Sequence, residues 1–246
     1  MKIQYCSDLH LEFEQNRKWI KDHPLKVSGD ILVLAGDIVP LHDEYLSNPF
    51  FEWASRHYRH VYWVPGNHEF YHRDIKDFSS GYEIKLGKNI SVIHNKAVTV
   101  DDVNIVFSSL WSEIQPKNEL LIEQSVSDFE CISNAGRRLK AADFNLLHRE
   151  SLQFVKKALA AHKDRSVVVS HHLPSNLCNA EEHKSSTINE AFCVDLTDYI
   201  IDCGAAFWIY GHSHFNQKPL FLGKTVLLTN QLGYVQAGEQ KGFRRD

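Results

Sequence analysis

The sequence predicts an α/β fold with mixed sheets. Short runs such as Ile31–Ala35 and Val103–Phe107 are nearly continuous in hydrophobic residues, which is typical of central strands covered on both faces. Longer stretches with helical periodicity, such as Phe144–His162, lie between these runs. Near the end of the chain, Gly223-Lys224 separates two further runs and is typical of a two-residue turn in an antiparallel hairpin.

In chain order, the expected strands start with the run that opens the sequence and finish with the hairpin. They are Ile3–Cys6, Ile31–Ala35, Val61–Val64, Ile90–His94, Val103–Phe107, Val167–Ser170, Phe207–Tyr210, Pro219–Leu222 and Thr225–Thr229. The expected helices are Pro49–His60, Phe144–His162 and Leu196–Cys203. Gly204 follows the last helix as a C-cap does. Because the chain has no internal repeat and no long linker, we expect residues 1–246 to form one domain.

The composition is that of an ordinary globular protein, with 43% hydrophobic and 24% charged residues. A formal net charge of −4 gives no long-range attraction to polyanions, so we expect no long nucleic acid as a partner. Five cysteines at irregular spacings predict reduced thiols. No apolar leader opens the sequence, and no run approaches the roughly 20 residues that span a bilayer. We therefore expect a cytoplasmic protein without a membrane partner.

Five polar clusters directly follow predicted strands, where the ligand sites of open α/β sheets lie. They are Ser7-Asp8-Leu9-His10, Ala35-Gly36-Asp37, Pro65-Gly66-Asn67-His68-Glu69, Ser170-His171-His172 and Gly211-His212-Ser213-His214. Each cluster alone is a weak signal, since an isolated Asp-x-His is more often a turn residue beside a buried histidine. Five such clusters at strand ends of one chain indicate a shared site.

The residue types in these clusters suit transition metals. Imidazole combined with carboxylate and amide oxygen favours Mn, Fe, Zn or Ni over calcium. Residues i and i+2 of an extended segment project to the same side, so Asp8 and His10 could address one ion. His212 and His214 stand in the same relation.

The ordered set of motifs resembles that of the calcineurin-like metallophosphoesterase superfamily, and the matching blocks run from residue 3 to residue 214. The resemblance implies a four-layer α/β/β/α sandwich with two metals in a cleft at the strand ends. By position, one metal would be held by Asp8, His10, Asp37 and His214, and the other by Asp37, Asn67, His212 and one of His171 and His172. Asp37 would bridge the two ions. His68 would not be a ligand, and would serve the leaving group or the transition state.

This ligand set predicts the hydrolysis of a small phosphate ester, either a monoester or a diester, with a nucleotide among the candidates. The cofactor would be two divalent transition metal ions. We favour Mn²⁺, and Fe, Zn and Ni are the alternatives. A hydroxide that bridges the ions would be the nucleophile. His68, with an ordinary pKa of about 6.5, could protonate the departing alkoxide. The alternatives are a binding module that kept the fold without catalysis, and a nuclease.

Pro40 departs from the pattern of two well-known branches of this superfamily. It stands three residues after Asp37, where Ser/Thr protein phosphatases have a histidine-orienting aspartate and purple acid phosphatases have a tyrosine ligand. The short chain and the opening Ser7-Asp8-Leu9-His10-Leu11-Glu12 look more like the small bacterial-type members. His68 therefore lacks a carboxylate partner from the usual position, and Glu69 is a candidate only by proximity.

Only one of the adjacent residues His171 and His172 is expected to reach the metal, because neighbours that leave a strand point to opposite sides. The position directly after the strand selects His171, whereas a position two residues before a proline, Pro174, selects His172. We favour His171, since strand direction fixes a side chain more firmly than loop length does. His172 would then flank the substrate or lie behind the ligands.

Residues 112–142 form a polar segment that is long for a plain connection. We expect it to overhang the cleft, with Trp111, Asp128 and Phe129 along one wall. The alternative is a surface insertion without a role at the site.

Overall fold

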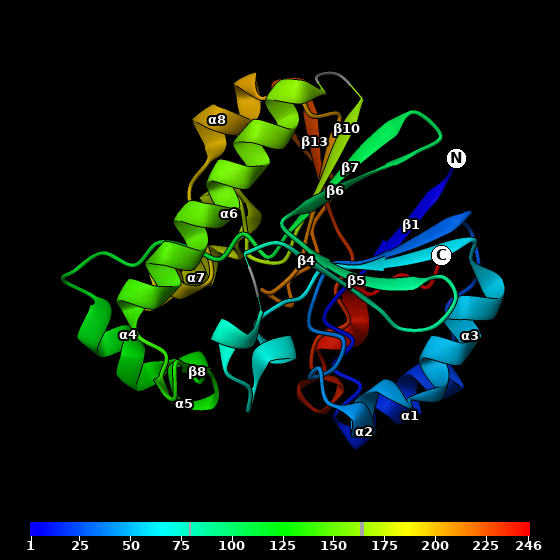
Figure 1. The fold of residues 1–246 in the computed structure, drawn as a ribbon, viewed down its shortest axis with the longest axis horizontal. Helices are drawn as coiled ribbons and strands as arrows, with labels where there is room; N and C mark the ends of the chain where they lie inside the picture. The colour runs from blue at the N-terminus through cyan, green and yellow to red at the C-terminus, as the bar shows by residue number, and fades with distance from the viewer. Residues whose placement is uncertain (79, 163–164) are drawn as a thin grey trace.

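The computed structural model describes residues 1–78, 80–162 and 165–246 and contains two sheets packed face to face (Figure 1). The first sheet has five strands in the order β1-β2-β3-β5-β4, and the second has six in the order β12-β13-β11-β10-β7-β6. The first comprises β1 (Ile3–Cys6), β2 (Ile31–Leu34), β3 (His60–Trp63), β4 (Tyr82–Lys85) and β5 (Ile90–His94). The second comprises β6 (Lys96–Val100), β7 (Val103–Ser108), β10 (Ser166–Ser170), β11 (Phe207–Tyr210), β12 (Leu220–Leu222) and β13 (Thr225–Thr229). A separate short hairpin joins β8 (Ser133–Asn134) to β9 (Arg137–Arg138).

Helices cover the outer faces of both sheets (Figure 1). The helices are α1 (Glu14–Asp22), α2 (Asp43–Leu46), α3 (Pro49–His57), α4 (Glu119–Ser125), α5 (Asp128–Cys131), α6 (Ala141–Ala161), α7 (Glu181–Lys184) and α8 (Thr197–Asp202). The buried faces of α1 and α3 pack on the first sheet, and those of α6 and α8 pack on the second. The predicted four-layer α/β/β/α sandwich is therefore confirmed.

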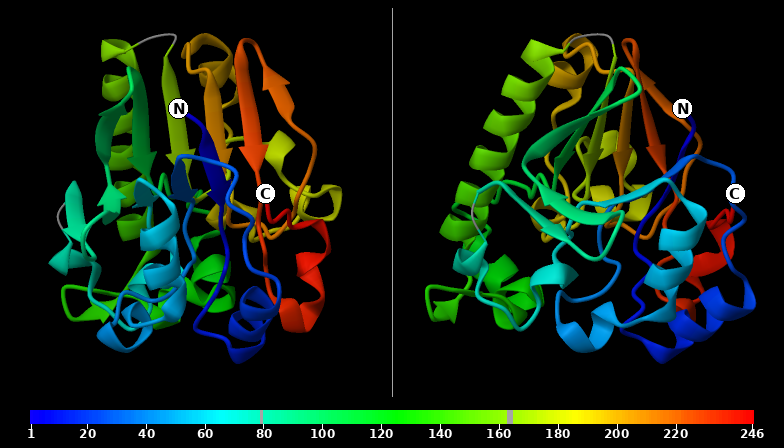
Figure 2. Two further views of the ribbon diagram at one scale, coloured as in Figure 1. Left: turned by 90° about the vertical axis from the view of Figure 1, so that its right-hand side faces the viewer. Right: turned by 45° about the vertical axis from the view of Figure 1, so that its right-hand side comes forward.

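The central strands of each sheet are parallel, and so is the edge strand β1 to β2. The other edge strands, β4, β6 and β12, are antiparallel to their neighbours. Between the sheets lies an apolar layer that includes Val33, Tyr62, Phe107, Val169 and Ile209. Because the central strands are covered on both faces, every residue of β2 and β10 is buried. In Figure 2 the central strands of both sheets point to the same half of the molecule, so their carboxyl ends meet at one edge.

The elements differ from the sequence predictions mainly at their ends. The helix expected over Pro49–His60 ends at His57, because Tyr58 has an extended backbone and His60 pairs with Ile31 in the first sheet. The helix expected from Phe144 begins at Ala141. At the Gly223-Lys224 turn, Gly223 has φ +58° and Leu222 pairs with Thr225, so the predicted hairpin is confirmed.

The segment 112–142 folds into α4, α5, the β8–β9 hairpin and the start of α6. Two of the aromatic residues expected on a cleft wall, Trp111 and Phe129, are instead buried in an apolar cluster with Phe70 and Phe144. Burying such large apolar side chains stabilises the fold more than exposing them to solvent in the cleft would, which explains the difference. Within the described part of the chain, no helix has the length and apolar character needed to cross a membrane.

Candidate metal centre and active site

Side chains from all five clusters come together where strands of the two sheets end. The backbone there is not extended, contrary to the sequence argument for Asp8 and His10. Within the clusters, the non-glycine residues that have a left-handed backbone are Asp8 (φ +55°), His10 (+44°), Asp37 (+55°), His212 (+78°) and His214 (+53°). Such conformations cost of order 1–3 kcal/mol for a non-glycine residue and concentrate at functional sites. Tight left-handed turns, and not strand pleating, aim these side chains.

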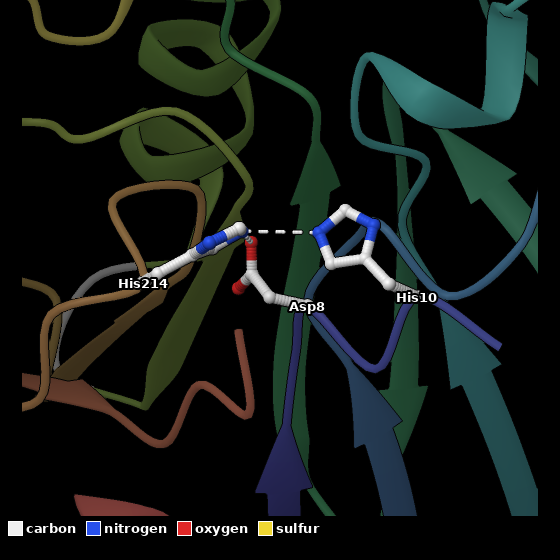
Figure 3. Close-up of side chains that lie close together, drawn as sticks. All are labelled: Asp8, His10 and His214. Atoms are coloured by element: carbon white, nitrogen blue, oxygen red, sulfur yellow. Dashed lines mark hydrogen bonds and ion pairs between the residues drawn. The ribbon is translucent and has the colours of Figure 1, made fainter. Parts of the chain in front are cut away.

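The first ligand group consists of Asp8, His10 and His214 (Figure 3). The Nε2 atoms of His10 and His214 face each other at 3.0 Å, and His214 Nε2 lies 3.4 Å from Asp8 Oδ1. Asp8 and His10 are fully buried. The two Asp8 oxygens also accept the backbone N–H of His212, at 3.0 and 3.1 Å, so the carboxylate is held in place from behind.

The second ligand group consists of Asp37, His171 and His212, with the side-chain oxygen of Asn67 beside them. His171 Nε2 lies 3.1 Å from Asn67 Oδ1, 3.1 Å from His212 Nδ1 and 3.3 Å from Asp37 Oδ1. The other ring nitrogen of His171 lies 2.9 Å from the carbonyl oxygen of Ala35. His212 and His214 therefore belong to different groups, and do not address one ion as their i, i+2 spacing suggested.

Asp37 lies between the two groups. Its Oδ1 faces His171 at 3.3 Å, while its Oδ2 faces His10 Nε2 at 3.8 Å. A carboxylate with one oxygen toward each donor group has the arrangement that a bridging ligand needs.

The donor atoms fit divalent ions. Ligand atoms that are about 2.1 Å from one ion and 90° apart lie about 3.0 Å from each other, which is the spacing of the nitrogen pairs here. Burial by itself lowers the pKa of His171 and His214, but Asp37 and Asp8 outweigh it and raise these pKa values to about 9 and about 10. The cluster therefore concentrates negative charge that cations would satisfy.

His68 lies beside the two groups and touches them through its backbone, whose N–H donates to Asp37 Oδ1 at 3.0 Å. Its Nδ1 lies 3.0 Å from Glu12 Oε1, and its Nε2 lies 3.4 Å from the hydroxyl of Tyr234. Burial lowers the pKa of His68, but Asp37 and Glu12 together raise it to about 8. The carboxylate partner that the sequence did not supply at position 40 is thus Glu12.

Glu69, the partner suggested by proximity, serves another purpose. Its two oxygens accept the backbone N–H groups of Asp37, Ile38 and Gly66 and the indole N–H of Trp63, at 2.5–3.0 Å. Burial, reinforced by the nearby Asp37 charge, raises the pKa of Glu69 to about 8. The fully buried Glu69 fixes the turns that carry Asp37 and Asn67, and does not contact His68 through its side chain.

Two further acidic residues, Asp128 and Glu239, orient members of the ligand groups. The Asn67 amide nitrogen donates to Asp128 Oδ1 at 2.8 Å, which turns the amide oxygen toward His171. His214 Nδ1 lies 2.7 Å from Glu239 Oε2. Asp128 comes from the 112–142 segment but is buried behind Asn67, so it does not line the cleft wall as expected from the sequence.

His172 is fully buried and does not line the cleft. Its Nδ1 lies 3.2 Å from the carbonyl oxygen of Ser109, and its ring packs against Trp111 and Phe144. The ring of His212 is 4.4 Å away, between centroids. His172 therefore supports a member of the second group and has no surface that a substrate could reach.

Comparison with known proteins settles the family. Residues 1–216 match the sequence profile of the calcineurin-like phosphoesterases. The chain belongs to this family. It is accordingly a phosphoric ester hydrolase, and the family together with the ligand groups supports a divalent metal cofactor.

Two known proteins are similar over most of their length. An uncharacterized protein of Acanthamoeba polyphaga mimivirus is 31% identical over 261 aligned positions, which cover 94% of this chain and 91% of the viral protein. The crystal structure of the phosphopantetheinyl hydrolase PptH from Mycobacterium tuberculosis superposes with a TM-score of 0.72 at 15% identity, covering 98% of this chain and 92% of that one. The second likeness shows that the two proteins share a fold.

The phosphoesterase site opens into a cleft of about 380 Å³. Asp37, Asn67, His68, His212 and His214 form its floor. The walls come from the end of α4 and the residues that follow it, from the loop between β10 and β11, and from the C-terminal turns around Tyr234.

Gly66→Ala is expected to disrupt the metal centre of this phosphoesterase without unfolding it. A Cβ at Gly66 would overlap Asp37 Oδ1 and lie 2.6 Å from His171 Nε2. We expect a loss of about 10–100-fold in metal affinity, as for other perturbations of ligand orientation. Titration with Mn²⁺ followed by calorimetry measures it. Gly136→Ala, which strains a left-handed turn (φ +76°) but has open space around it, is the control for destabilisation without crowding. Wild-type affinity in Gly66→Ala would show that the two groups do not form the metal site.

Proposed function

We propose that the chain hydrolyses an ester of a small organic phosphate or nucleotide with the help of two divalent metal ions. Mn²⁺ is the metal that we favour. The observation that carries this proposal is the position of Asp37 between two donor groups, with one carboxylate oxygen facing each. Asp8, His10 and His214 would hold one ion together with Asp37. Asn67, His171 and His212 would hold the other, again with Asp37.

When bound, such an ion pair supplies Lewis acidity toward the phosphoryl oxygens and lowers the pKa of water toward about 7. The chain itself provides His68, whose Nε2 is directed toward Tyr234 at the side of the cleft. A proton on this nitrogen would be delivered to the leaving oxygen as the ester bond breaks. Glu12 on the opposite ring nitrogen holds His68 in that orientation.

The two other candidate functions have less support. A binding module without catalysis would not need His68 and its carboxylate partner beside a complete set of ligand residues. A nuclease for long strands would need cationic side chains along the cleft, and none of the described residues that line it is Lys or Arg. Hydrolysis of a chromogenic phosphomonoester, a chromogenic phosphodiester and single-stranded DNA, each with Mn²⁺, separates the three. Absence of turnover on all three substrates would contradict the proposed function.

The metal content gives a direct test of the proposed centre. After saturation with Mn²⁺ and desalting, elemental analysis should find about two equivalents per chain, as dinuclear sites of this chemistry require. Asp37→Asn should lower both occupancies, because Asp37 faces both groups. A reproducible single equivalent in an enzyme with full activity would contradict the dinuclear assignment.

A further inference from the structure

The walls of the cleft carry few ionisable side chains, and most of their described residues are hydroxyl, amide or apolar. On the side of α4 they consist of Ser125, Val126 and Ser127, and on the opposite side Ile188 and Phe192 add apolar surface. No described residue that lines the cleft is Lys or Arg, and on the walls the acidic Glu239 is accompanied by one imidazole, that of His183. A phosphate ester would therefore meet no permanently cationic side chain on the walls.

The floor has little positive charge to spare. If two divalent ions bind as proposed, four carboxylates match them: Asp8 and Asp37 within the ligand groups, and Glu12 and Glu239 against the ring nitrogens of His10 and His214. The proton that His68 would hold for the leaving group adds one positive charge, which a hydroxide nucleophile would offset. A phosphomonoester carries two negative charges at neutral pH, since its second pKa is about 6. A phosphodiester carries one charge, and its second organic group would pack against the hydroxyl and apolar walls.

From this charge balance, which rests on the proposed function, we infer that the enzyme prefers phosphodiester monoanions with neutral substituents to phosphomonoester dianions. In the reaction, one P–O ester bond breaks and the oxygen of water forms a new P–O bond. One proton of the water goes to the leaving oxygen and the other is released to solvent. The products are an alcohol and a phosphomonoester, which is the more highly charged species and is poorly retained by a neutral cleft.

The test adds one cation to the wall. Ser127 is exposed at the cleft and its side chain makes no hydrogen bond at the start of α5, so Ser127→Arg can reach a bound anion without breaking a contact. Leu120→Arg, on the 69% exposed Leu120 of α4, is the control with the same added charge outside the cleft. Calorimetry with Mn²⁺-loaded protein compares two non-hydrolysable ligands, phenylphosphonate as a dianion and its methyl ester as a monoanion.

Ser127→Arg should strengthen binding of the dianion by roughly five- to tenfold and leave the monoanion within about threefold, whereas Leu120→Arg should change neither. In the wild type, kcat/KM for a bis-aryl phosphodiester should exceed that for the matched aryl monoester. The inference is overturned if the wild type hydrolyses the monoester faster than the diester and Ser127→Arg does not change the relative affinity for the two ligands. Absence of turnover on both esters counts instead against the proposed function.

A different observation concerns Glu12. One of its oxygens, Oε1, lies 3.0 Å from Nδ1 of His10 and also 3.0 Å from Nδ1 of His68. Both rings therefore turn their Nε2 atoms inward, His10 toward His214 and His68 toward Tyr234. The side chain of Glu12 is 9% exposed, and no other carboxylate in the described chain contacts both rings.

We propose that Glu12 is a positioning residue that orients a metal ligand and the proton-donating histidine through a single oxygen atom. A second carboxylate beside His68 is then unnecessary, which accounts for Pro40 at the position where an aspartate would otherwise stand. Glu12→Ala should weaken Mn²⁺ binding and lower kcat for esters with poor leaving groups, each by about 10–100-fold, with little change in KM. Glu12→Gln should retain most of both properties, because its amide oxygen can accept from both rings.

Glu14→Gln is the matched control for lost charge, since Glu14 is exposed on α1 two residues away. Thermal melting verifies that each variant is folded, and Glu12→Gln remains informative if Glu12→Ala is not. A merely structural role would lower the rates for good and poor leaving groups equally. That result, or metal affinity in a folded Glu12→Ala equal to that of Glu14→Gln, overturns the proposal.

Discussion

His68→Ala is expected to lose about 10²–10⁴-fold in kcat on esters with poor leaving groups while it keeps its metal. The loss follows from the position of Nε2, which lies at the side of the cleft and is not shared with either ligand group. Metal should remain, because the contact of His68 with Asp37 is made by the backbone N–H, which alanine retains. Rates on a series of aryl esters, together with elemental analysis, measure both quantities.

The deficit of His68→Ala should shrink as the leaving group improves, because a stable departing anion needs no proton. His57→Ala, at an exposed position on α3, is the control for the loss of an imidazole elsewhere. A deficit of equal size for good and poor leaving groups would argue that His68 stabilises the phosphoryl group and does not donate the proton.

Most strand ends of this enzyme could be predicted from sequence because most of the central strands are nearly continuous apolar runs. Burial on both faces requires such runs, and a polar residue directly after one lies at the sheet edge. The edge strands β4 and β6 were not predicted, because most of their residues are partly or fully exposed and each strand mixes charged with apolar residues. Helix α1 was missed for a similar reason, since Asn16 and Ile20 are its buried residues.

Sequence reasoning could propose which residues gather at the site but not how they are aimed. The i, i+2 rule assumes an extended backbone, whereas Asp8 and His10 have φ of +55° and +44°. The supporting carboxylates were harder still to find. Asp128 is far in sequence from Asn67, so no local pattern connects the two residues. For Glu12 the only sequence signal is that it follows His10 by two residues, just as His10 follows Asp8.

His171→Ala is expected to remove one metal ion and to abolish most of the activity, whereas His172→Ala should keep both ions. His171 Nε2 lies within 3.1–3.3 Å of donor atoms of Asn67, His212 and Asp37, so its loss takes a ligand from the second group. His172 directs Nδ1 to the carbonyl of Ser109 and has no such contacts. Elemental analysis of both variants after saturation with Mn²⁺ distinguishes them.

The physical basis of this difference is the end of β10. Successive side chains leave a strand on opposite sides, so His171, directly after Ser170, faces Asp37, while His172 faces the apolar cluster that contains Trp111. His172→Ala opens a cavity beside the His212 ring and should weaken the second ion by about 10–100-fold without removing it at saturating metal. Loss of metal from His172→Ala combined with full occupancy in His171→Ala would require the two rings to exchange places, and would refute the ligand set proposed for the second ion.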